Sequence, residues 1–192
     1  MQNISYAKTV YGEEEIEAVV KCLRESTQMG NYSRKFEAKI SDLFDKKETL
    51  YVNSGSSALF IGIEAMNFPE GSEVITPSLT FGTTVGCLLK NDLVPVFLDV
   101  KPLTYCIDES LIEGAITDKT VAILAPNLMG NVCNWPFIRE IANKNNLIVI
   151  EDSADTLGAT INGKKSGSFS DMSITSFYGS HIINCAGNGG SL

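Results

Sequence analysis

Three carboxylates directly follow an apolar run in the segment "VIEDSAD", residues 149–155. They belong to Glu151, Asp152 and Asp155. A carboxylate buried at the end of a strand needs a partner, which could be a metal ion, a proton in transfer or a protonated ring nitrogen. No second ligand cluster with metal-site spacing accompanies these residues, which disfavours a metal. The simplest alternative is a solvated strand end without chemical function.

Two further segments combine small, polar and aromatic residues after apolar runs. "NSGSSAL", residues 53–59, places Gly55, Ser56 and Ser57 at the start of an expected helix, where free N–H groups and the helix dipole favour a phosphate. An ordinary N-cap explains the same residues equally well. In "TPSLTFGTT", residues 76–84, Phe81 could stack on a flat ligand ring or pack in the core.

The only histidine of the sequence, His181, lies in "SFYGSHIINCAGNGG", residues 176–190. A neutral imidazole can act as a general base near pH 7. A single histidine is also commonly a structural residue, so this position alone does not decide between the two roles.

Alternating strands and helices are expected to position these residues. Short apolar runs predict strands within residues 49–53, 72–77, 93–100, 121–126, 147–152 and 170–177, and the third to fifth of these are expected to be buried. Helical spacing predicts helices over 12–25, 33–44, 56–66, 81–89 and 134–145, the second behind Ser33 as N-cap. "TINGKKSGS", residues 160–168, predicts a hairpin turning at Asn162 and Gly163, with solvated lysines.

This alternation predicts an α/β fold of layers with a mostly parallel sheet. In such sheets ligands bind beyond the carboxyl ends of the strands. The carboxylates, the glycine-serine turn, Phe81 and His181 all follow predicted strands, so we expect them to meet at one edge of the sheet.

Composition narrows the class of protein. The 192 residues carry a formal net charge of -8 and no basic cluster, which makes nucleic-acid binding unlikely from the sequence. No run reaches the roughly 20 apolar residues of a membrane helix, and the N-terminal segment does not have the pattern of a signal peptide. Five dispersed cysteines indicate reduced thiols, and we expect a cytoplasmic protein.

The order and spacing of the motifs resemble the DegT/DnrJ/EryC1/StrS family of sugar aminotransferases and their dehydratase relatives, in the fold-type I pyridoxal-phosphate superfamily. The resemblance covers essentially the whole chain. It is carried by "GNYSRKFE", "NSGSSAL", "VITPSLTF", "VPVFLDVKPLTYCID", "VIEDSADTLGA", "GKKSGSFSD" and "SFYGSH" with "GNGG". It implies a three-layer α/β/α large domain, of which residues 1–192 are the N-terminal and cofactor-binding part. The small C-terminal domain is then absent from this chain.

The resemblance also implies roles for individual residues. Gly55, Ser56 and Ser57 match the turn that binds the cofactor phosphate, and Ser176 matches a serine that assists it. Phe81 matches the aromatic residue that stacks on the pyridine ring. Asp152 matches the acid that pairs with the ring nitrogen, which keeps the ring an electron sink. The implied assembly is a homodimer with shared active sites.

Two positions depart from the aminotransferase pattern. Asp155, expected in the cofactor site, stands where those enzymes generally have glutamine. His181 stands where they carry the lysine that binds the cofactor covalently. Imidazole cannot replace that bond, so the cofactor is expected to be held non-covalently while proton transfer is retained. Lys164 and Lys165 lie in the predicted hairpin, away from this position.

The same substitution resembles that of the family's 3-dehydratases, which also share the "EDxxDALG" pattern. It implies dehydration of a nucleotide-linked 4-keto-6-deoxyhexose at C3 with pyridoxamine 5'-phosphate, His181 acting as base. The alternatives are a pyridoxal-phosphate-dependent nucleotide-sugar aminotransferase and a non-catalytic relative that binds cofactor or sugar.

The match to the dehydratases is incomplete after His181. Their "SFYPAHHITxGEGG" pattern differs here at Gly179, Ile182 and Asn188, and one extra residue precedes Gly189. This insertion is expected to shift the loop and could re-aim the imidazole.

Overall fold

The computed structural model describes residue 4, residues 10–26 and residues 28–192. The prediction about a signal peptide falls partly outside these residues. The helices are α1 (Glu13–Glu25), α2 (Asn31–Phe44), α3 (Gly55–Met66), α4 (Gly82–Lys90), α5 (Ile112–Ala115) and α6 (Trp135–Asn145). The strands are β1 (Tyr51–Val52), β2 (Glu73–Pro77), β3 (Val94–Leu98), β4 (Thr120–Pro126), β5 (Ile148–Asp152), β6 (Thr160–Ile161), β7 (Lys164–Lys165), β8 (Met172–Ser176) and β9 (Gly190–Ser191). Short 3-10 turns cover Glu109–Leu111, Leu128–Gly130 and Ser166–Phe169.

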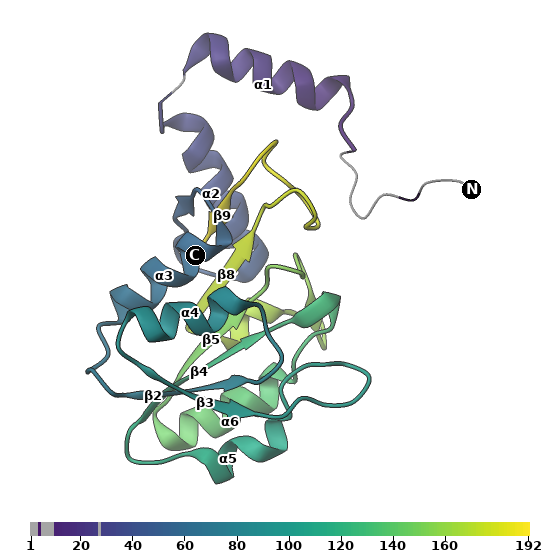
Figure 1. Cartoon of the computed structure of the whole chain (residues 1–192). Helices are drawn as coiled ribbons and strands as arrows, with labels where there is room; N and C mark the ends of the chain where they lie inside the picture. The colour runs from purple at the N-terminus through teal and green to yellow at the C-terminus, as the bar shows by residue number, and fades with distance from the viewer. Residues whose placement is uncertain (1–3, 5–9, 27) are drawn as a thin grey trace.

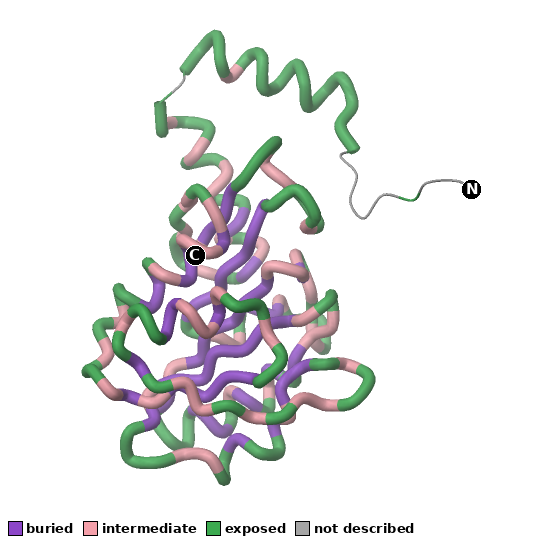
Figure 2. Tube along the Cα trace, viewed as in Figure 1, coloured by how far each residue is buried: buried purple, intermediate pink, exposed green. Residues whose placement is uncertain are grey.

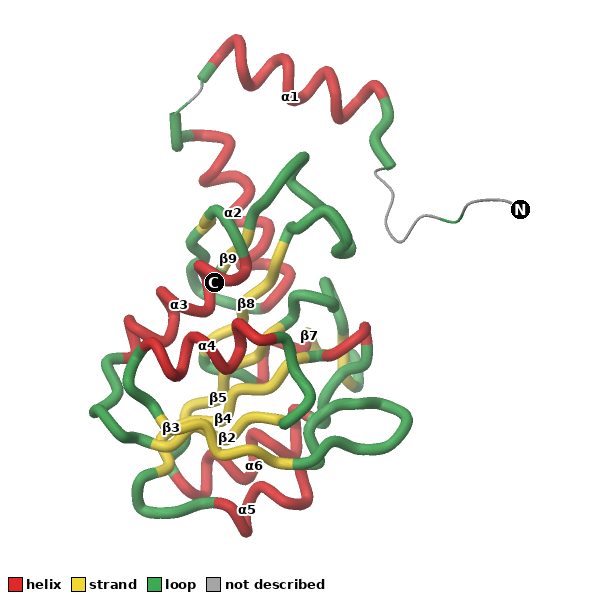
Figure 3. Tube along the Cα trace, viewed as in Figure 1, coloured by secondary structure: helices red, strands yellow, loops and turns green. Residues whose placement is uncertain are grey.

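The main sheet has the order β1-β9-β8-β5-β4-β2-β3 (Figure 3). The five strands from β8 to β3 are parallel, and β9 runs antiparallel to both β8 and β1. This confirms the mostly parallel sheet predicted from the alternation of strands and helices. Because the five strands are parallel, their carboxyl ends lie along the same edge.

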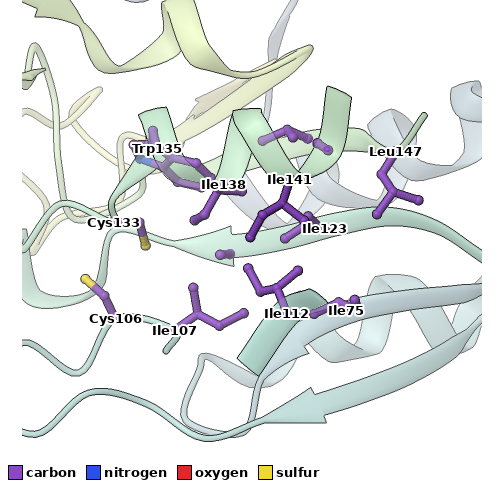
Figure 4. Close-up of a cluster of buried hydrophobic side chains, with 13 residues drawn as sticks. Ile75, Cys106, Ile107, Ile112, Ile123, Cys133, Trp135, Ile138, Ile141 and Leu147 are labelled. Atoms are coloured by element: carbon purple, nitrogen blue, oxygen red, sulfur yellow. The ribbon is translucent and has the colours of Figure 1, made fainter. Parts of the chain in front are cut away.

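Helices cover both faces of the sheet, so the fold is the predicted three-layer α/β/α arrangement (Figure 1). Alternate strand residues point to opposite faces. Ile75, Ile123 and Val149 pack with α5 and α6, in the core cluster shown in Figure 4. Val74 and Leu124 instead pack with α3 and α4 in a second cluster.

Strand β3 differs from its prediction as a buried strand. It pairs only with β2 and forms an edge of the sheet, with Val94 and Phe97 half exposed. Its apolar composition is typical of a central strand, but its edge position leaves Val94 and Phe97 uncovered.

Helix α2 begins two residues before the predicted cap. Gly30 is its N-cap, and the Arg34 N–H bonds to the Gly30 carbonyl at 3.0 Å. Ser33 therefore lies inside the first turn, and the prediction of Ser33 as N-cap is wrong. Helix α1, by contrast, has no buried residue and lies apart from the rest of the chain (Figure 2).

The predicted hairpin is confirmed as β6 and β7, with Asn162 and Gly163 both at positive φ in its turn. Lys164 is exposed, as predicted. Lys165 is not simply solvated, because its ammonium donates to the Asp42 carbonyl and forms an ion pair with the Asp42 carboxylate at 3.1 Å. The contact joins the hairpin to α2, which the local sequence could not indicate. Across residues 10–26 and 28–192, no helix has the length and apolar character required to cross a membrane.

Candidate active site

A cavity of about 860 Å³ opens beyond the carboxyl ends of β4, β5 and β8. The N-terminal ends of α3 and α4 and the segment that follows β8 complete its walls. The sequence-predicted residues that line it are Gly55, Ser56, Phe81, Asp152, Asp155, Ser176 and His181. The structure thus brings together side chains from four separate sequence segments.

The N-terminus of α3 presents unpaired backbone donors to this cavity. Ser54 caps the helix: its Oγ accepts from the Ser57 N–H at 3.1 Å. The N–H groups of Gly55 and Ser56 precede the first intrahelical bond and have no partner within the helix. Ser57 does not line the cavity, so its predicted role has less geometric support than those of Gly55 and Ser56. Free N–H groups at a helix N-terminus suit an anion such as a phosphate.

Glycines allow this helix end to approach the neighbouring strands closely. A Cβ on Gly55 would lie 2.7 Å from Ser176 Cβ, and one on Gly190 would lie 2.3 Å from the Ser54 carbonyl carbon. Neither distance is possible for a real side chain. The glycines therefore bring the Ser176 hydroxyl next to the donors at the start of α3.

Asp152 ends β5 as a buried carboxylate, with only 5% of the residue exposed. Its Oδ1 accepts from the Ala154 N–H at 3.1 Å, and its Oδ2 accepts from the buried Thr84 hydroxyl at 3.2 Å. Burial raises the pKa of Asp152 to about 6, although these two hydrogen bonds oppose the shift. A buried acid in this state is favourably placed to pair with a cationic group such as a protonated ring nitrogen.

Phe81 is the N-cap residue of α4 and is 71% exposed. The alternative that it packs in the core is wrong. Phe81 lines the cavity, and its high exposure leaves the side chain accessible to a ligand there.

His181 lies at the cavity in spite of the extra residue that follows it. Its backbone N–H bonds to the Tyr178 carbonyl at 2.9 Å, and its ring lies edge-on to the Tyr178 ring at 5.9 Å. Phe177, fully buried against Phe36 of α2, fixes the start of this segment. The Phe177 N–H also bonds to the Gly189 carbonyl at 2.8 Å, which closes the loop at its other end.

Asp155 lies beside the imidazole. Its Oδ1 is 3.8 Å from His181 Nε2, and its Oδ2 accepts from the Met129 N–H at 2.9 Å. The other ring nitrogen, Nδ1, is buried and has no hydrogen-bond partner within the described part of the chain.

A buried hydrogen-bond network centred on Asn127 lies at the cavity. It was not identified from the sequence. Asn127 donates to Glu151 and Ser153, both at 2.9 Å. Its side-chain oxygen accepts from the Cys133 N–H and from the Trp135 indole N–H, also at 2.9 Å each. The Asn127 N–H bonds to the Asp152 carbonyl at 2.8 Å, so the network reaches the candidate cofactor acid.

The network also excludes the solvated strand end as the explanation of the acidic cluster. Glu151 is fully buried and accepts from Ser153 at 2.7 Å and Ser173 at 3.0 Å. A signal for Asn127 existed, since this polar residue directly follows the predicted strand "VAILAP".

No lysine in residues 10–26 or 28–192 lines the cavity. Lys164 and Lys165 line a different hollow together with Asp45 and Phe169. Among the described residues, His181 is therefore the only basic side chain that lines the cavity.

Comparisons with known proteins agree with this fold. The profile of the DegT/DnrJ/EryC1/StrS aminotransferase family matches residues 10–192. The chain is 38% identical to the lipopolysaccharide biosynthesis protein RfbH of Salmonella typhimurium, over 95% of this chain and 44% of that protein. It is also 38% identical to a UDP-N-acetyl-3-dehydro-alpha-D-glucosamine 3-aminotransferase of Acidithiobacillus ferrooxidans, over 84% of this chain and 44% of that protein.

A solved structure shares the fold over the whole chain. It is GDP-4-keto-6-deoxy-D-mannose-3-dehydratase of Escherichia coli with bound hydrated PLP, at a TM-score of 0.92 and 32% identity, covering 100% of this chain and 51% of that one. The chain thus spans about half the length of the proteins it matches. Relatives of both reaction types, aminotransferase and dehydratase, are represented. The match over nearly the entire sequence establishes that this chain belongs to the DegT/DnrJ/EryC1/StrS aminotransferase family.

Proposed function

We propose that the complete protein carrying this chain dehydrates a nucleotide-linked 4-keto-6-deoxyhexose at C3, using pyridoxamine 5'-phosphate, with His181 as the base. The observation that carries the proposal is the imidazole beside Asp155, at a cavity that Asp152 also lines and that no lysine of the described ranges lines. A transaminase requires a lysine there to bind the cofactor covalently and to shuttle protons.

The cavity fits the cofactor chemically. The N–H groups of Gly55 and Ser56 and the Ser176 hydroxyl offer donors to its phosphate, and a Cβ on Gly55 would close this space. Phe81 offers its exposed ring face to the pyridine ring. Asp152 offers a buried carboxylate to the ring nitrogen. When bound, the cofactor supplies an electron sink for the reacting sugar.

His181 holds and moves the proton in this proposal. A neutral imidazole can accept a proton near pH 7 but cannot bind the cofactor covalently. Its Nδ1 is buried and has no hydrogen-bond partner in the described residues.

The rest of the assembly is also a proposal. The chain spans about half the length of its relatives. We propose that residues 1–192 are the N-terminal and cofactor-binding part of a large domain and that a smaller domain completes the protein. We propose a homodimer with shared active sites in the cytoplasm. The five cysteines are free, in keeping with that location.

An aminotransferase is the second candidate, favoured by the 38% identity to a named sugar aminotransferase. The experiment incubates the complete protein with pyridoxamine phosphate and a 4-keto-6-deoxy sugar linked to GDP, CDP or dTDP, with and without glutamate. Mass spectrometry distinguishes loss of water from gain of an amine. A cofactor that borohydride fixes onto a lysine would support transamination, and ligand binding without turnover would support a non-catalytic relative.

A further inference from the structure

The Asp155 carboxylate lies between a fixed backbone donor and the imidazole of His181. Its Oδ2 accepts from the Met129 N–H at 2.9 Å, and its Oδ1 lies 3.8 Å from His181 Nε2. We propose that Asp155 is a positioning residue that places the proton of the imidazole on Nε2 and leaves Nδ1 as the proton acceptor. This inference rests on the proposed function, in which His181 is the base, and it gives Asp155 a role distinct from cofactor binding.

Met129 determines how the carboxylate is oriented. It lies in the turn Leu128–Gly130 with φ 56°, and the Asn131 N–H closes this turn on the Leu128 carbonyl at 3.0 Å. A backbone N–H held in a turn points in a fixed direction, and Asp155 Oδ2 is the oxygen that accepts from it. The second oxygen is then the one that faces the imidazole.

An ionised carboxylate only accepts hydrogen bonds, so the imidazole nitrogen that faces it must be the donor. That nitrogen is Nε2. The distance of 3.8 Å exceeds a hydrogen bond, and catalytic contacts are often this loose before the ligand binds.

Among the residues that the structure describes, Asp155 is the acid paired with His181. The other ring contact recorded there is the neutral ring of Tyr178, edge-on at 5.9 Å. Nδ1 is buried without a hydrogen-bond partner in the same ranges. This is the nitrogen that an Asp155-fixed tautomer leaves without a proton.

The Asp155→Asn variant tests the tautomer directly. We expect the oxygen of the new amide to keep the hydrogen bond from the Met129 N–H, which turns its NH2 group toward His181 Nε2. An NH2 group donates, and the imidazole proton must therefore move from Nε2 to Nδ1. Nitrogen-15 NMR of histidine-labelled complete protein without cofactor distinguishes the two tautomers, and the signal of His181 is the one absent from a His181→Gln variant.

The expected result is Nε2–H in the wild type and Nδ1–H in Asp155→Asn. A matched control is Asp118→Asn, an exposed aspartate outside the cavity, which should leave the wild-type tautomer unchanged. If folded Asp155→Asn keeps the proton on Nε2, the inference is overturned. The wild-type tautomer would then reflect the preference of imidazole itself for Nε2–H and not the effect of Asp155. Circular dichroism establishes that the variants are folded.

A kinetic measurement separates this role from cofactor binding. A wrong tautomer in a catalytic triad lowers kcat by about 10⁴, so we expect a loss of about 10²–10⁴ in the kcat of dehydration for Asp155→Asn. Its affinity for pyridoxamine phosphate, measured by calorimetry, should match the wild type. A large loss of cofactor affinity with unchanged kcat overturns the inference.

Failure of the proposed function is distinguishable from failure of this inference. If His181→Gln retains full dehydration, His181 is not the base and the proposed function fails, whatever the tautomer. If His181→Gln loses dehydration but Asp155→Asn retains both kcat and tautomer, the proposed function stands and the positioning role of Asp155 falls.

Discussion

Replacing Asp152 by asparagine should stabilise the cofactor-free protein while it weakens cofactor binding. The pKa of Asp152 is raised by burial from 3.8 to about 6. At pH 7 the folded chain therefore holds a charge that is disfavoured relative to the unfolded chain, by about 3 kcal/mol at 1.36 kcal/mol for each pKa unit. Asparagine is nearly isosteric, accepts from the Ala154 N–H and donates to the Thr84 hydroxyl, so the contacts of the carboxylate are replaced.

The gain should depend on pH in a defined direction. The pKa of Asp152 is higher in the folded chain, so the folded state binds more protons between pH 4 and pH 6 and wild-type stability falls as the pH rises through this window. Below pH 4 the wild-type carboxyl is protonated in both states, and the advantage of Asp152→Asn disappears. Above about pH 6 the advantage reaches its full value.

Urea unfolding at pH 4, 5, 6 and 7 measures this difference, with Asp118→Asn as the exposed control. Pyridoxamine phosphate should reverse the ranking, because a charge-assisted hydrogen bond to the ring nitrogen is worth about 1.5–3 kcal/mol. Calorimetry should then show binding to Asp152→Asn weakened by about 10- to 150-fold. A variant that is less stable than wild type at pH 7, or equally stable at every pH, refutes the reasoning.

Three other substitutions test the walls of the site. Gly55→Ala should lower the free energy of unfolding by about 1–3 kcal/mol and weaken cofactor binding, because its Cβ would lie 2.7 Å from Ser176 Cβ. The control Gly114→Ala in α5 should be tolerated, because a Cβ there meets open space. Phe81→Ala should weaken cofactor binding with little change in urea stability, since the ring is 71% exposed, and a large loss of stability would contradict a stacking role. Asn127→Ala should lower the free energy of unfolding in urea by about 3–5 kcal/mol, because it leaves two buried donors without a partner and removes one of the donors to the buried Glu151 carboxylate. A loss below about 1 kcal/mol would show that water replaces the amide.

The fold was largely predictable because its strands and helices are marked by strong apolar periodicity. The apolar runs predicted the positions of the parallel strands, and Asn162 with Gly163 predicted the hairpin. The exposure of β3 was not predictable, because its apolar sequence resembles that of a central strand. Only the strand order shows that β3 has a neighbour on one side.

The candidate site was predictable where a residue follows a strand and unpredictable where it acts from a distance. Asp152 and His181 stand out by type and place in the sequence. Thr84, which donates to Asp152, is separated from it by 68 residues, and no local sequence pattern indicates this contact. Asn127 likewise reveals its role only through partners on β5 and α6. Contacts of this kind depend on strand order, which periodicity does not encode.

The role of His181 as the base of dehydration is tested by comparing wild type with His181→Gln. Each complete protein reacts with pyridoxamine phosphate and GDP-4-keto-6-deoxymannose, and the mass of the product is measured. CDP- and dTDP-linked 4-keto-6-deoxy sugars complete the panel, since the nucleotide is not specified by these residues. Wild type should release a sugar that has lost one water, His181→Gln should not, and no cofactor should become fixed to a lysine on borohydride treatment. An aminated product from wild type, or full dehydration by His181→Gln, would contradict this role.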